Sequence, residues 1–242
     1  MPLTKQTILI TGAGGGLGST AALTLAEHGA TVILLDKNIP KLEKVYDRLV
    51  AANTPTPIIY PFDLAGASEV QYHELADAIE AKYGHLDGIL HSAVELDAFT
   101  PMSIHSTMAW GHTLNVNLNA VFLLNQVLLP LLQKVEHASI VVTGDSFVHE
   151  ARAYMGSYGV SKVALASYAK TLAEELSESG KVRINLLIPG PVDSPLRKKA
   201  FPAEDKSKLP SMDEIAPVYL YLFGAKSIGT TGQTVDARTL KL

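Results

Sequence analysis

The stretch ILITGAGGGLGSTAALTLAEHGATVILLD, residues 8–36, constrains the fold more than any other part of the chain. Two short apolar runs enclose a cluster of glycines and a segment of helical length. A strand that runs into glycines and then directly into a helix directs backbone N–H groups and the positive helix end beyond the strand. The stretch therefore predicts a strand–helix–strand unit with an anion site at the carboxyl end of its first strand.

The same alternation continues along the rest of the chain. Short runs rich in Val, Ile and Leu recur, and longer segments of helical period lie between them. This pattern is typical of a parallel sheet with helices on both faces and ligands at the carboxyl ends of the strands. The expected strands are residues 7–11, 31–36, 57–61, 86–91, 138–143 and 182–188, and the expected helices are about 17–28, 40–52, 68–83, 105–132 and 154–179.

No composition break divides the 242 residues, so we expect a single α/β domain spanning 1–242. One polar segment interrupted by prolines, residues 191–211, follows the sixth strand. It is predicted to be a lid rather than a linker, because Ser211 and Glu214 form a capping-box pattern that starts the next helix directly.

Composition excludes several classes of protein. The net charge is −4 and the 20 basic residues are scattered, which argues against nucleic-acid binding. The chain has no cysteine, so disulfides and thiolate sites are excluded and the cytoplasm is the default location. The longest apolar run, AVFLLNQVLLPLL, is broken by polar residues and proline, and no membrane span is expected. The sequence has no HExxH motif, and GDSF lacks the second glycine of a G-x-S-x-G elbow, so neither a metal site nor a serine hydrolase is expected.

The glycine cluster and the end of the second strand together indicate a dinucleotide site. Gly12, Gly14, Gly15, Gly16 and Gly18 would seat a pyrophosphate, although a ligand-free glycine turn is the alternative. Asp36 closes the second strand, where an acidic residue accepts hydrogen bonds from both ribose hydroxyls and repels a 2′-phosphate. This favours NAD over NADP, but the neighbouring Lys37 weakens the preference and leaves NADP possible. The alternative for Asp36 is a simple turn residue.

Tyr158 and Lys162 form the second chemical signal. Four residues apart on a helix, they share a face, so the ammonium is expected to lower the pKa of the phenol from its ordinary value of about 10. The pair predicts a general acid/base on the helix that follows the fifth strand. His91, at the end of the fourth strand, is expected to be a pocket wall rather than a base.

Several motifs fall in a fixed order along the chain: Thr11-Gly12-x-x-x-Gly16-x-Gly18, Asp63 after the third strand, Asn117 in NVNLNAVF, Tyr158-x-x-x-Lys162 and Asn185-x-x-x-Pro189-Gly190. With them the chain resembles, over nearly its whole length, the short-chain dehydrogenase/reductase family of the compact single-domain kind. The segments LDGILHSAV and AFPAEDKSKLPSMDEIAPVYLYL are most similar to the bacterial YciK-type oxidoreductases. The resemblance implies a doubly wound Rossmann-type sheet of about seven strands in the order 3-2-1-4-5-6-7.

The resemblance also implies a role for each residue that matches. Tyr158 would exchange a proton with a carbonyl or alcohol oxygen, Lys162 would hold the nicotinamide ribose, and Asn117 would hold a water that relays protons from Lys162. For Asn117, a helix-kinking asparagine is the alternative. The implied cofactor-binding residues are Gly12, Gly14, Gly15, Gly16, Leu17, Gly18, Asp36, Lys37, Asp63, Leu64, Ser92, Ala93, Tyr158, Lys162, Pro189, Gly190, Val192 and Ser194.

The chain departs from the family at three places, one of which is the C-terminal segment GQTVDARTLKL, which lacks the paired glycines that commonly follow the last strand. Ser92-Ala93-Val94 stands where the family usually has Asn-Ala-Gly, and Asp145 occupies the usual serine position, thirteen residues before the tyrosine. A carboxylate at this position would repel a developing alkoxide. We therefore expect the loop to shift by one residue, so that Ser146 faces the substrate and Asp145 turns aside. A buried, protonated Asp145 is the alternative.

Two function hypotheses follow. The first is an NAD(P)-dependent oxidoreductase that acts on a small carbonyl compound or secondary alcohol and assembles as a homodimer or homotetramer through the helices at 105–132 and 154–179. The second is a catalytically weakened dinucleotide-binding sensor or structural subunit, suggested by Asp145, Ser92 and Val94.

Overall fold

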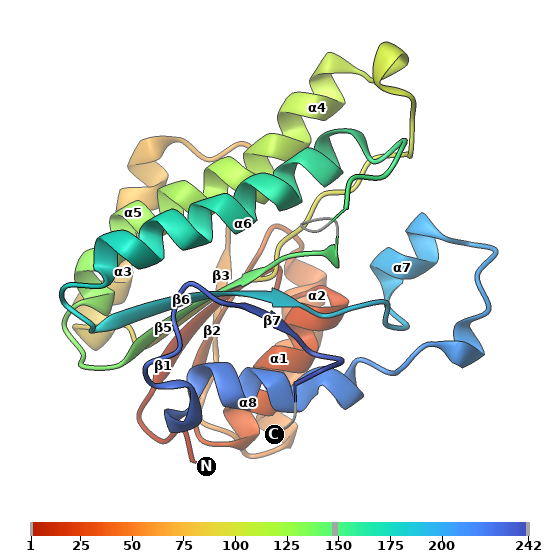
Figure 1. Ribbon diagram of the computed structural model, residues 1–242. Helices are drawn as coiled ribbons and strands as arrows, with labels where there is room; N and C mark the ends of the chain where they lie inside the picture. The colour runs from red at the N-terminus through yellow and green to blue at the C-terminus, as the bar shows by residue number, and fades with distance from the viewer. Residues whose placement is uncertain (1, 147–149, 241–242) are drawn as a thin grey trace.

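A parallel sheet forms the centre of the molecule (Figure 1). The computed structural model describes residues 2–146 and 150–240, and within them seven strands pair in the order β3-β2-β1-β4-β5-β6-β7. The strands are β1 Thr7–Thr11, β2 Thr31–Asp36, β3 Ile58–Pro61, β4 Gly88–His91, β5 Ala138–Thr143, β6 Val182–Ile188 and β7 Thr234–Asp236. The predicted order is confirmed. The strand order reverses between β1 and β4, because β2 and β3 lie on one side of β1 and β4 to β7 lie on the other. Folds of this kind bind their ligands in the crevice at the carboxyl ends of the two strands where the order reverses.

Helices cover both faces of the sheet, with α1, α2 and α8 on one face and α3 to α6 on the other (Figure 1). Their bounds are α1 Gly16–Glu27, α2 Ile39–Ala51, α3 Glu69–Tyr83, α4 Thr107–Leu114, α5 Ala120–Leu132, α6 Gly156–Leu176, α7 Pro195–Ala200 and α8 Ala216–Phe223. The helix expected at 105–132 is divided by a π-helical turn, Asn115–Asn119. The turn is invisible in the sequence because the apolar period runs through it.

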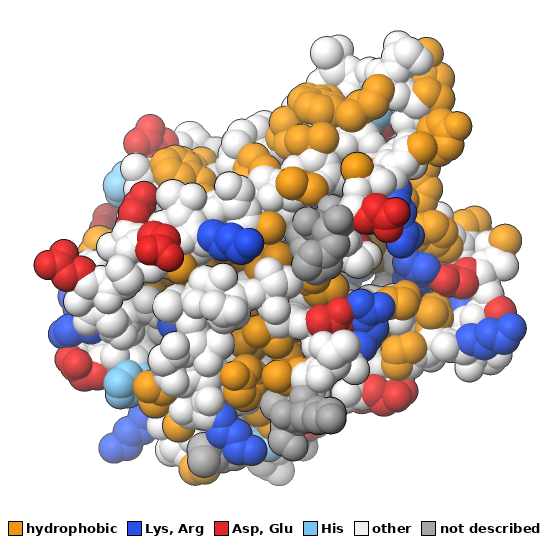
Figure 2. Space-filling model, viewed as in Figure 1, with side chains coloured by type: hydrophobic (Ala, Val, Ile, Leu, Met, Phe, Trp, Pro, Cys, Tyr) orange, Lys and Arg blue, Asp and Glu red, His pale blue; other side chains and the backbone are white. Residues whose placement is uncertain are grey.

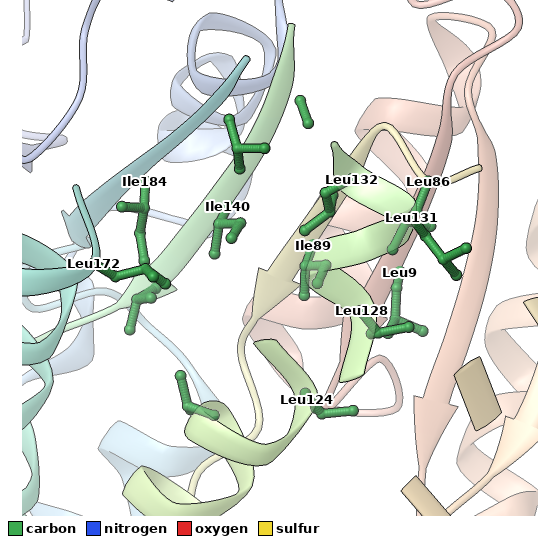
Figure 3. Close-up of a cluster of buried hydrophobic side chains, with 14 of the residues drawn as sticks. Leu9, Leu86, Ile89, Leu124, Leu128, Leu131, Leu132, Ile140, Leu172 and Ile184 are labelled. Atoms are coloured by element: carbon green, nitrogen blue, oxygen red, sulfur yellow. The ribbon is translucent and has the colours of Figure 1, made fainter. Parts of the chain in front are cut away.

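The core consists of two apolar layers, one on each side of the sheet. In β5, Ile140 and Val142 face the α3–α6 layer and Val141 faces the α1–α8 layer. Figure 3 shows the first layer, where Leu124, Leu128 and Leu131 of α5 lie against the strands. Both faces of each central strand are buried, which explains why the strands read as continuous apolar runs rather than as alternating ones.

The helical stretch Thr107–Leu132 has a mean hydropathy of 1.4 and is long and apolar enough to cross a membrane by length and composition alone. Half of the 18-residue window of this stretch that has this hydropathy is buried inside the fold. Leu124 and Leu128 pack into the apolar layer against the sheet, so the stretch is a covering helix of the sheet in this structure.

The segment between β6 and α8 extends beyond the carboxyl ends of the strands (Figure 1). It contains α7 and a short 3₁₀ helix, Lys206–Lys208. At its end, the Ser211 N–H donates to Glu214 Oε1 at 2.7 Å, and the Glu214 N–H donates to Ser211 Oγ at 3.3 Å. The predicted capping box is therefore confirmed, and it leads through Asp213–Ile215 into α8.

Candidate functional site

The glycine loop lies between β1 and α1 at the open crevice. Gly12 has a φ of +65°, and a Cβ on it would lie 2.6 Å from the Cα of Ala93. A Cβ on Gly18 would overlap the Gly12 carbonyl group. Any other residue would therefore push the loop away from the helix or from the neighbouring strand end. The amides that follow the loop begin α1, whose N-terminus faces the crevice.

Thr11 joins the two strand ends that form the crevice. Its Oγ1 accepts hydrogen bonds from the N–H groups of Ser92 and Ala93, both at 3.1 Å. Position 92 is usually an asparagine in the family, and Ser92 lacks its side-chain amide. The two hydrogen bonds to Thr11 hold the backbone after β4 in place without that amide. Thr11 was quoted in the motif but not predicted as a site residue; its place at the end of a buried strand, directly before the glycines, was the available signal.

Asp36 is positioned at the end of β2 by two backbone groups. Its Oδ2 accepts from the Gly14 N–H at 3.2 Å, and its Oδ1 accepts from the Asn38 N–H at 2.9 Å. The carboxylate borders a cavity of about 250 Å³. The predicted residues Gly12, Gly15, Asp36, Lys37, Asp63, Leu64, Ser92 and Ala93 line this cavity together with Asn38, Lys41, Phe62, Val94, Glu95 and Val116, which were not predicted.

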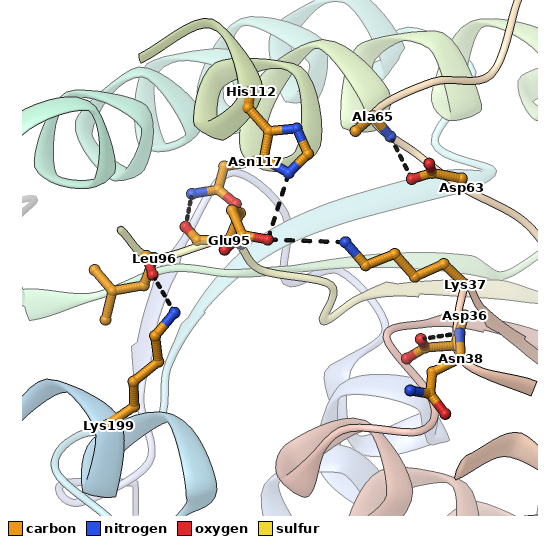
Figure 4. A network of polar contacts seen from close by, with 10 residues as sticks. All are labelled: Asp36, Lys37, Asn38, Asp63, Ala65, Glu95, Leu96, His112, Asn117 and Lys199. Atoms are coloured by element: carbon orange, nitrogen blue, oxygen red, sulfur yellow. Dashed lines mark hydrogen bonds and ion pairs between the residues drawn. The ribbon is translucent and has the colours of Figure 1, made fainter. Parts of the chain in front are cut away.

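Glu95 reaches across this cavity from the loop after β4 (Figure 4). Its Oε2 lies 4.0 Å from Lys37 Nζ and 3.6 Å from His112 Nε2. Lys37 is therefore directed toward a carboxylate, and part of its charge is offset. No sequence pattern indicates this contact, because it joins two loops that only the sheet order brings together.

Asn117 fixes the same loop from the π-helical turn. Its side chain accepts from the Glu95 N–H at 2.7 Å and donates to the Glu95 carbonyl at 2.9 Å (Figure 4). It also donates to Ser161 Oγ at 3.1 Å. The side chain is buried and lines neither cavity. Its contacts show that it positions the loop, and the proton relay from Lys162 stays a prediction.

A second cavity, of about 350 Å³, continues from the glycine loop toward the lid. The predicted residues Gly12, Gly15, Gly16, Leu17, Gly18, Ser92, Asp145, Tyr158, Lys162, Pro189, Gly190, Val192 and Ser194 line it. Of the other predicted residues, Gly14, Asn117 and Ser146 line neither cavity. Lining residues that were not predicted include Lys41, Val94, Leu96, Phe99, Thr143, Arg197, Lys199 and Phe201.

Tyr158 and Lys162 share one face of α6, as their spacing predicts. Lys162 Nζ donates to the Thr143 carbonyl at 2.7 Å and lies 5.7 Å from the centre of the Tyr158 ring. Burial lowers the pKa of Lys162 to about 8, partly offset by the charge of Asp145.

Asp145, and not Ser146, contacts the phenol. The Tyr158 hydroxyl donates to Asp145 Oδ2 at 2.8 Å, and the Ser146 hydroxyl donates to Asp145 Oδ1 at 3.1 Å. The expected one-residue shift of the loop is therefore wrong. A carboxylate would be repelled by an alkoxide, which is the neighbour that the prediction assumed. In the structure its neighbour is the neutral phenol of Tyr158, which donates a strong charge-assisted hydrogen bond to the carboxylate.

The electrostatics of the pair also differ from the expectation. Burial, followed by the charge of Asp145 and the hydrogen bond to it, raises the pKa of Tyr158 well above its ordinary value, and Arg197 opposes the shift. The prediction that Lys162 lowers this pKa is wrong for the structure. The ammonium binds the Thr143 carbonyl, while the carboxylate lies directly against the hydroxyl.

The outer end of the larger cavity is formed by α7 and the loop after β4. Arg197 makes two hydrogen bonds of 2.6 Å to the carboxylate of Glu204 and lies 4.0 Å above the Phe201 ring. Phe201 and Phe99 have ring centroids 5.4 Å apart. Lys199 Nζ donates to the Leu96 carbonyl at 2.8 Å (Figure 4). The exposed walls here are therefore mainly apolar, and the cations are engaged by oxygens of the chain.

Comparison with known proteins agrees with this geometry. A family model described as short chain dehydrogenase matches residues 6–205. The oxidoreductase YciK of Escherichia coli K12 is 39% identical over 236 residues, which are 98% of this chain and 93% of that protein. Two solved structures have TM-scores of 0.94 and cover 98% of both chains. They are a short chain dehydrogenase of Shigella flexneri complexed with NADP, 38% identical, and one of Escherichia coli CFT073 complexed with NADPH, 39% identical.

The family model covers most of the chain, and the matched residues include the glycine loop and the Tyr158/Lys162 pair. The strand order of the structure brings these two parts to one crevice. The chain therefore belongs to the short-chain dehydrogenase family.

Proposed function

We propose that the protein transfers a hydride between a nicotinamide dinucleotide and a small carbonyl compound or secondary alcohol. The observation that carries this proposal is the position of Tyr158 and Lys162 on the wall of the cavity that begins at the glycine loop. A proton donor and a dinucleotide seat at one crevice are what hydride transfer to a carbonyl requires.

The residues of the crevice fit a dinucleotide. The loop can approach a pyrophosphate closely because Gly12 and Gly18 have no room for a Cβ. Thr143 is a lining residue of the larger cavity, and its buried Oγ1 has no hydrogen-bond partner among the described residues. The bound cofactor would supply or accept the hydride.

In this proposal Tyr158 gives its phenolic proton to the carbonyl oxygen or takes the proton of the alcohol. Lys162 holds a positive charge below the phenol and would contact the nicotinamide ribose when it releases the Thr143 carbonyl. Pro189, Gly190, Val192 and Ser194 would shape the nicotinamide end of the cavity, and Asp63 with Leu64 the adenine end.

We propose NAD(H) as the preferred cofactor, with NADP(H) as a weaker ligand. The two solved relatives are complexed with NADP or NADPH, and so the comparisons do not favour NAD. The proposal depends on Asp36 of this chain, whose carboxylate borders the adenosine end of the crevice, and on Lys37, whose ammonium is directed toward Glu95.

One observation favours the second function hypothesis, a dinucleotide-binding sensor or structural subunit. The proton of Tyr158 is held by Asp145, and the pKa of the phenol is raised rather than lowered. Such a site would bind the dinucleotide and turn over slowly or not at all.

The remaining proposals concern assembly, the lid and location. Apolar side chains on the long helices are exposed, with Met108 at 84% and Phe122 at 49% on α4 and α5, and Val160 and Val163 on α6. Figure 2 shows hydrophobic side chains gathered over the α4 end of the molecule. We propose that these helices form a homodimer or homotetramer interface, that residues 191–211 act as a lid, and that the protein is cytoplasmic.

Turnover separates the two function hypotheses. The purified protein is incubated with NADH or NADPH and a panel of aldehydes and ketones, and cofactor oxidation is followed at 340 nm. A substrate whose turnover is lost in Tyr158→Phe, while cofactor affinity is kept, supports the oxidoreductase. Tight cofactor binding without turnover across the panel supports the sensor.

A further inference from the structure

Asp145 is a carboxylate inside the proposed substrate cavity, and its hydrogen-bond partners among the described residues are neutral. Its two oxygens accept from the hydroxyls of Tyr158 and Ser146. Among the residues that the structure describes, no ion pair joins Asp145 to a basic side chain within 4.0 Å. Lys162 and Arg197 are close enough to interact with its charge, but they direct their hydrogen bonds to Thr143 and Glu204.

A carboxylate in this position opposes the reduction of a simple ketone for two reasons. It repels the negative charge that develops on the carbonyl oxygen, and it holds the phenolic proton that this oxygen must receive. A positive charge next to the reacting carbonyl removes both obstacles, because it pairs with the carboxylate and releases the phenol.

The distance between the two groups restricts where that charge belongs. Tyr158 Oη and Asp145 Oδ2 are 2.8 Å apart. A nitrogen and an oxygen on neighbouring carbons of a substrate are about 3 Å apart, as standard bond lengths and angles give in the folded rotamer. The carbonyl oxygen can therefore lie against the phenol while an ammonium on the adjacent carbon lies against the carboxylate.

The other walls define the rest of the substrate. Val94, Leu96, Leu196 and the rings of Phe99 and Phe201 line the outer part of the cavity. Four basic side chains, Lys41, Lys162, Arg197 and Lys199, line the same cavity, and the last three donate to Thr143, Glu204 and Leu96. Asp145 is the one acidic residue among the lining residues, and its carboxylate together with the apolar and aromatic walls suits a compound that brings a cationic head to Asp145 and carries an aryl or alkyl body.

We propose that Asp145 selects α-amino ketones and the corresponding vicinal amino alcohols that carry an apolar substituent. The inference rests on the proposed oxidoreductase function and names its substrate class. In the reduction, the carbonyl carbon receives a hydride from the reduced nicotinamide, and the oxygen receives the phenolic proton of Tyr158. The C=O π bond becomes a C–H and an O–H bond, the cofactor is oxidised, and the phenolate is reprotonated from solvent.

The test compares 2-(dimethylamino)acetophenone, which is cationic when protonated, with neutral acetophenone. Both are assayed with NADH and with NADPH, so that cofactor preference does not affect the outcome. Because an ammonium activates a ketone by itself, the measured quantity is the change in the kcat/KM ratio of the two substrates between wild type and Asp145→Ser. We expect this ratio to fall at least about tenfold, and Asp145→Asn, which keeps the shape and removes the charge, to behave likewise.

A binding measurement that needs no turnover accompanies the assay. Calorimetry on cofactor-saturated protein compares 2-phenylethylamine with 2-phenylethanol, which have the same shape. The wild type should bind the amine at least about tenfold more tightly, and the two neutral variants should not discriminate. The wild-type comparison stands even where a variant does not fold.

An unchanged ratio in both variants, or equal binding of amine and alcohol by the wild type, overturns the assignment of Asp145 and leaves the oxidoreductase proposal in place. Absence of turnover with every ketone, neutral or cationic, overturns the oxidoreductase proposal and this inference with it.

Discussion

Replacing Asp36 with asparagine tests the cofactor proposal most directly. The carboxylate is half-buried at the end of β2, and it accepts hydrogen bonds from the N–H groups of Gly14 and Asn38 at 3.2 and 2.9 Å. Asparagine has nearly the same shape but keeps only one oxygen acceptor, so its NH2 group faces one of these two N–H donors and that hydrogen bond is lost. Asp36→Asn therefore removes one negative charge and one of the two contacts that position the strand end.

The expected magnitude follows from this charge. A 2′-phosphate carries between one and two negative charges at neutral pH. A unit charge about 4 Å from a carboxylate costs about 1 kcal/mol in water and about 4 kcal/mol at the lower effective dielectric near a protein surface. Asp36 lies between these environments. We therefore expect the wild type to bind NADPH about tenfold to a hundredfold more weakly than NADH, and Asp36→Asn to recover most of that loss while its NADH affinity falls a few-fold.

Calorimetric titration with NADH and NADPH at low and moderate salt measures both affinities, and the preference should shrink as salt screens the repulsion. The matched control is Glu95→Gln, which removes the carboxylate 4.0 Å from Lys37 and leaves Asp36 unchanged. This variant should improve NADPH binding only modestly, because the pair is exposed. Equal or reversed affinities in the wild type, with no change in Asp36→Asn, would show that Lys37 outweighs Asp36 and would refute the reasoning.

Three further predictions concern the proton donor, the glycine loop and the core. Tyr158→Phe should abolish turnover and keep cofactor affinity within a few-fold, since only the phenolic proton is lost; retained steady-state turnover would remove the mechanism. Gly18→Ala should destabilise the fold by about 1–3 kcal/mol and weaken cofactor binding, because its Cβ would overlap the Gly12 carbonyl. Gly111→Ala on α4, with no atom within 4 Å of its Cβ, should stabilise by about 0.5–1 kcal/mol, and urea unfolding compares the two. Burial lowers the pKa of His91 to about 4, so the unfolded chain binds a proton at this residue before the folded chain does as the pH falls below about 6.5. Roughly 3 kcal/mol of the free energy of unfolding should therefore be lost between pH 6.5 and pH 4. In His91→Gln, urea unfolding should show no such His91-dependent loss over this pH range.

The fold could be predicted from the sequence wherever burial alone determines a boundary. β1, β2, β5 and β6 begin and end at the predicted residues, because each is a buried apolar run that stops at a turn. β7 was expected without a range, since it has three residues and only Val235 is buried. His91, expected at a pocket wall, is buried in the core against Asn125 at 2.9 Å, because the helix that covers it could not be positioned from the sequence.

The site was predictable as a set of residue types and less so as a set of contacts. Gly12, Gly15, Gly16, Gly18, Asp36 and the Tyr158/Lys162 pair line the two adjoining cavities, since parallel strand ends must meet at one edge of the sheet, and their roles toward a ligand stay predictions. The partners of their charged groups were not predictable. Glu95 approaches Lys37 only through the loop after β4, and the direction of the Asp145 side chain depends on whether its neighbour is a phenol or an alkoxide.

The charge of Asp145 connects the proton donor Tyr158 with the kind of substrate that the site suits. Lys162, with a pKa of about 8, is mostly protonated at neutral pH, yet its ammonium binds a backbone carbonyl and the phenol of Tyr158 stays bound to Asp145. Moving the phenolic proton to a ketone breaks the hydrogen bond to Asp145 and leaves a phenolate beside this carboxylate. On the inference above, a cationic group on the substrate would offset these two negative charges, in addition to Lys162 and Arg197, which already interact with Asp145. A cationic ketone is therefore the most informative probe of this site.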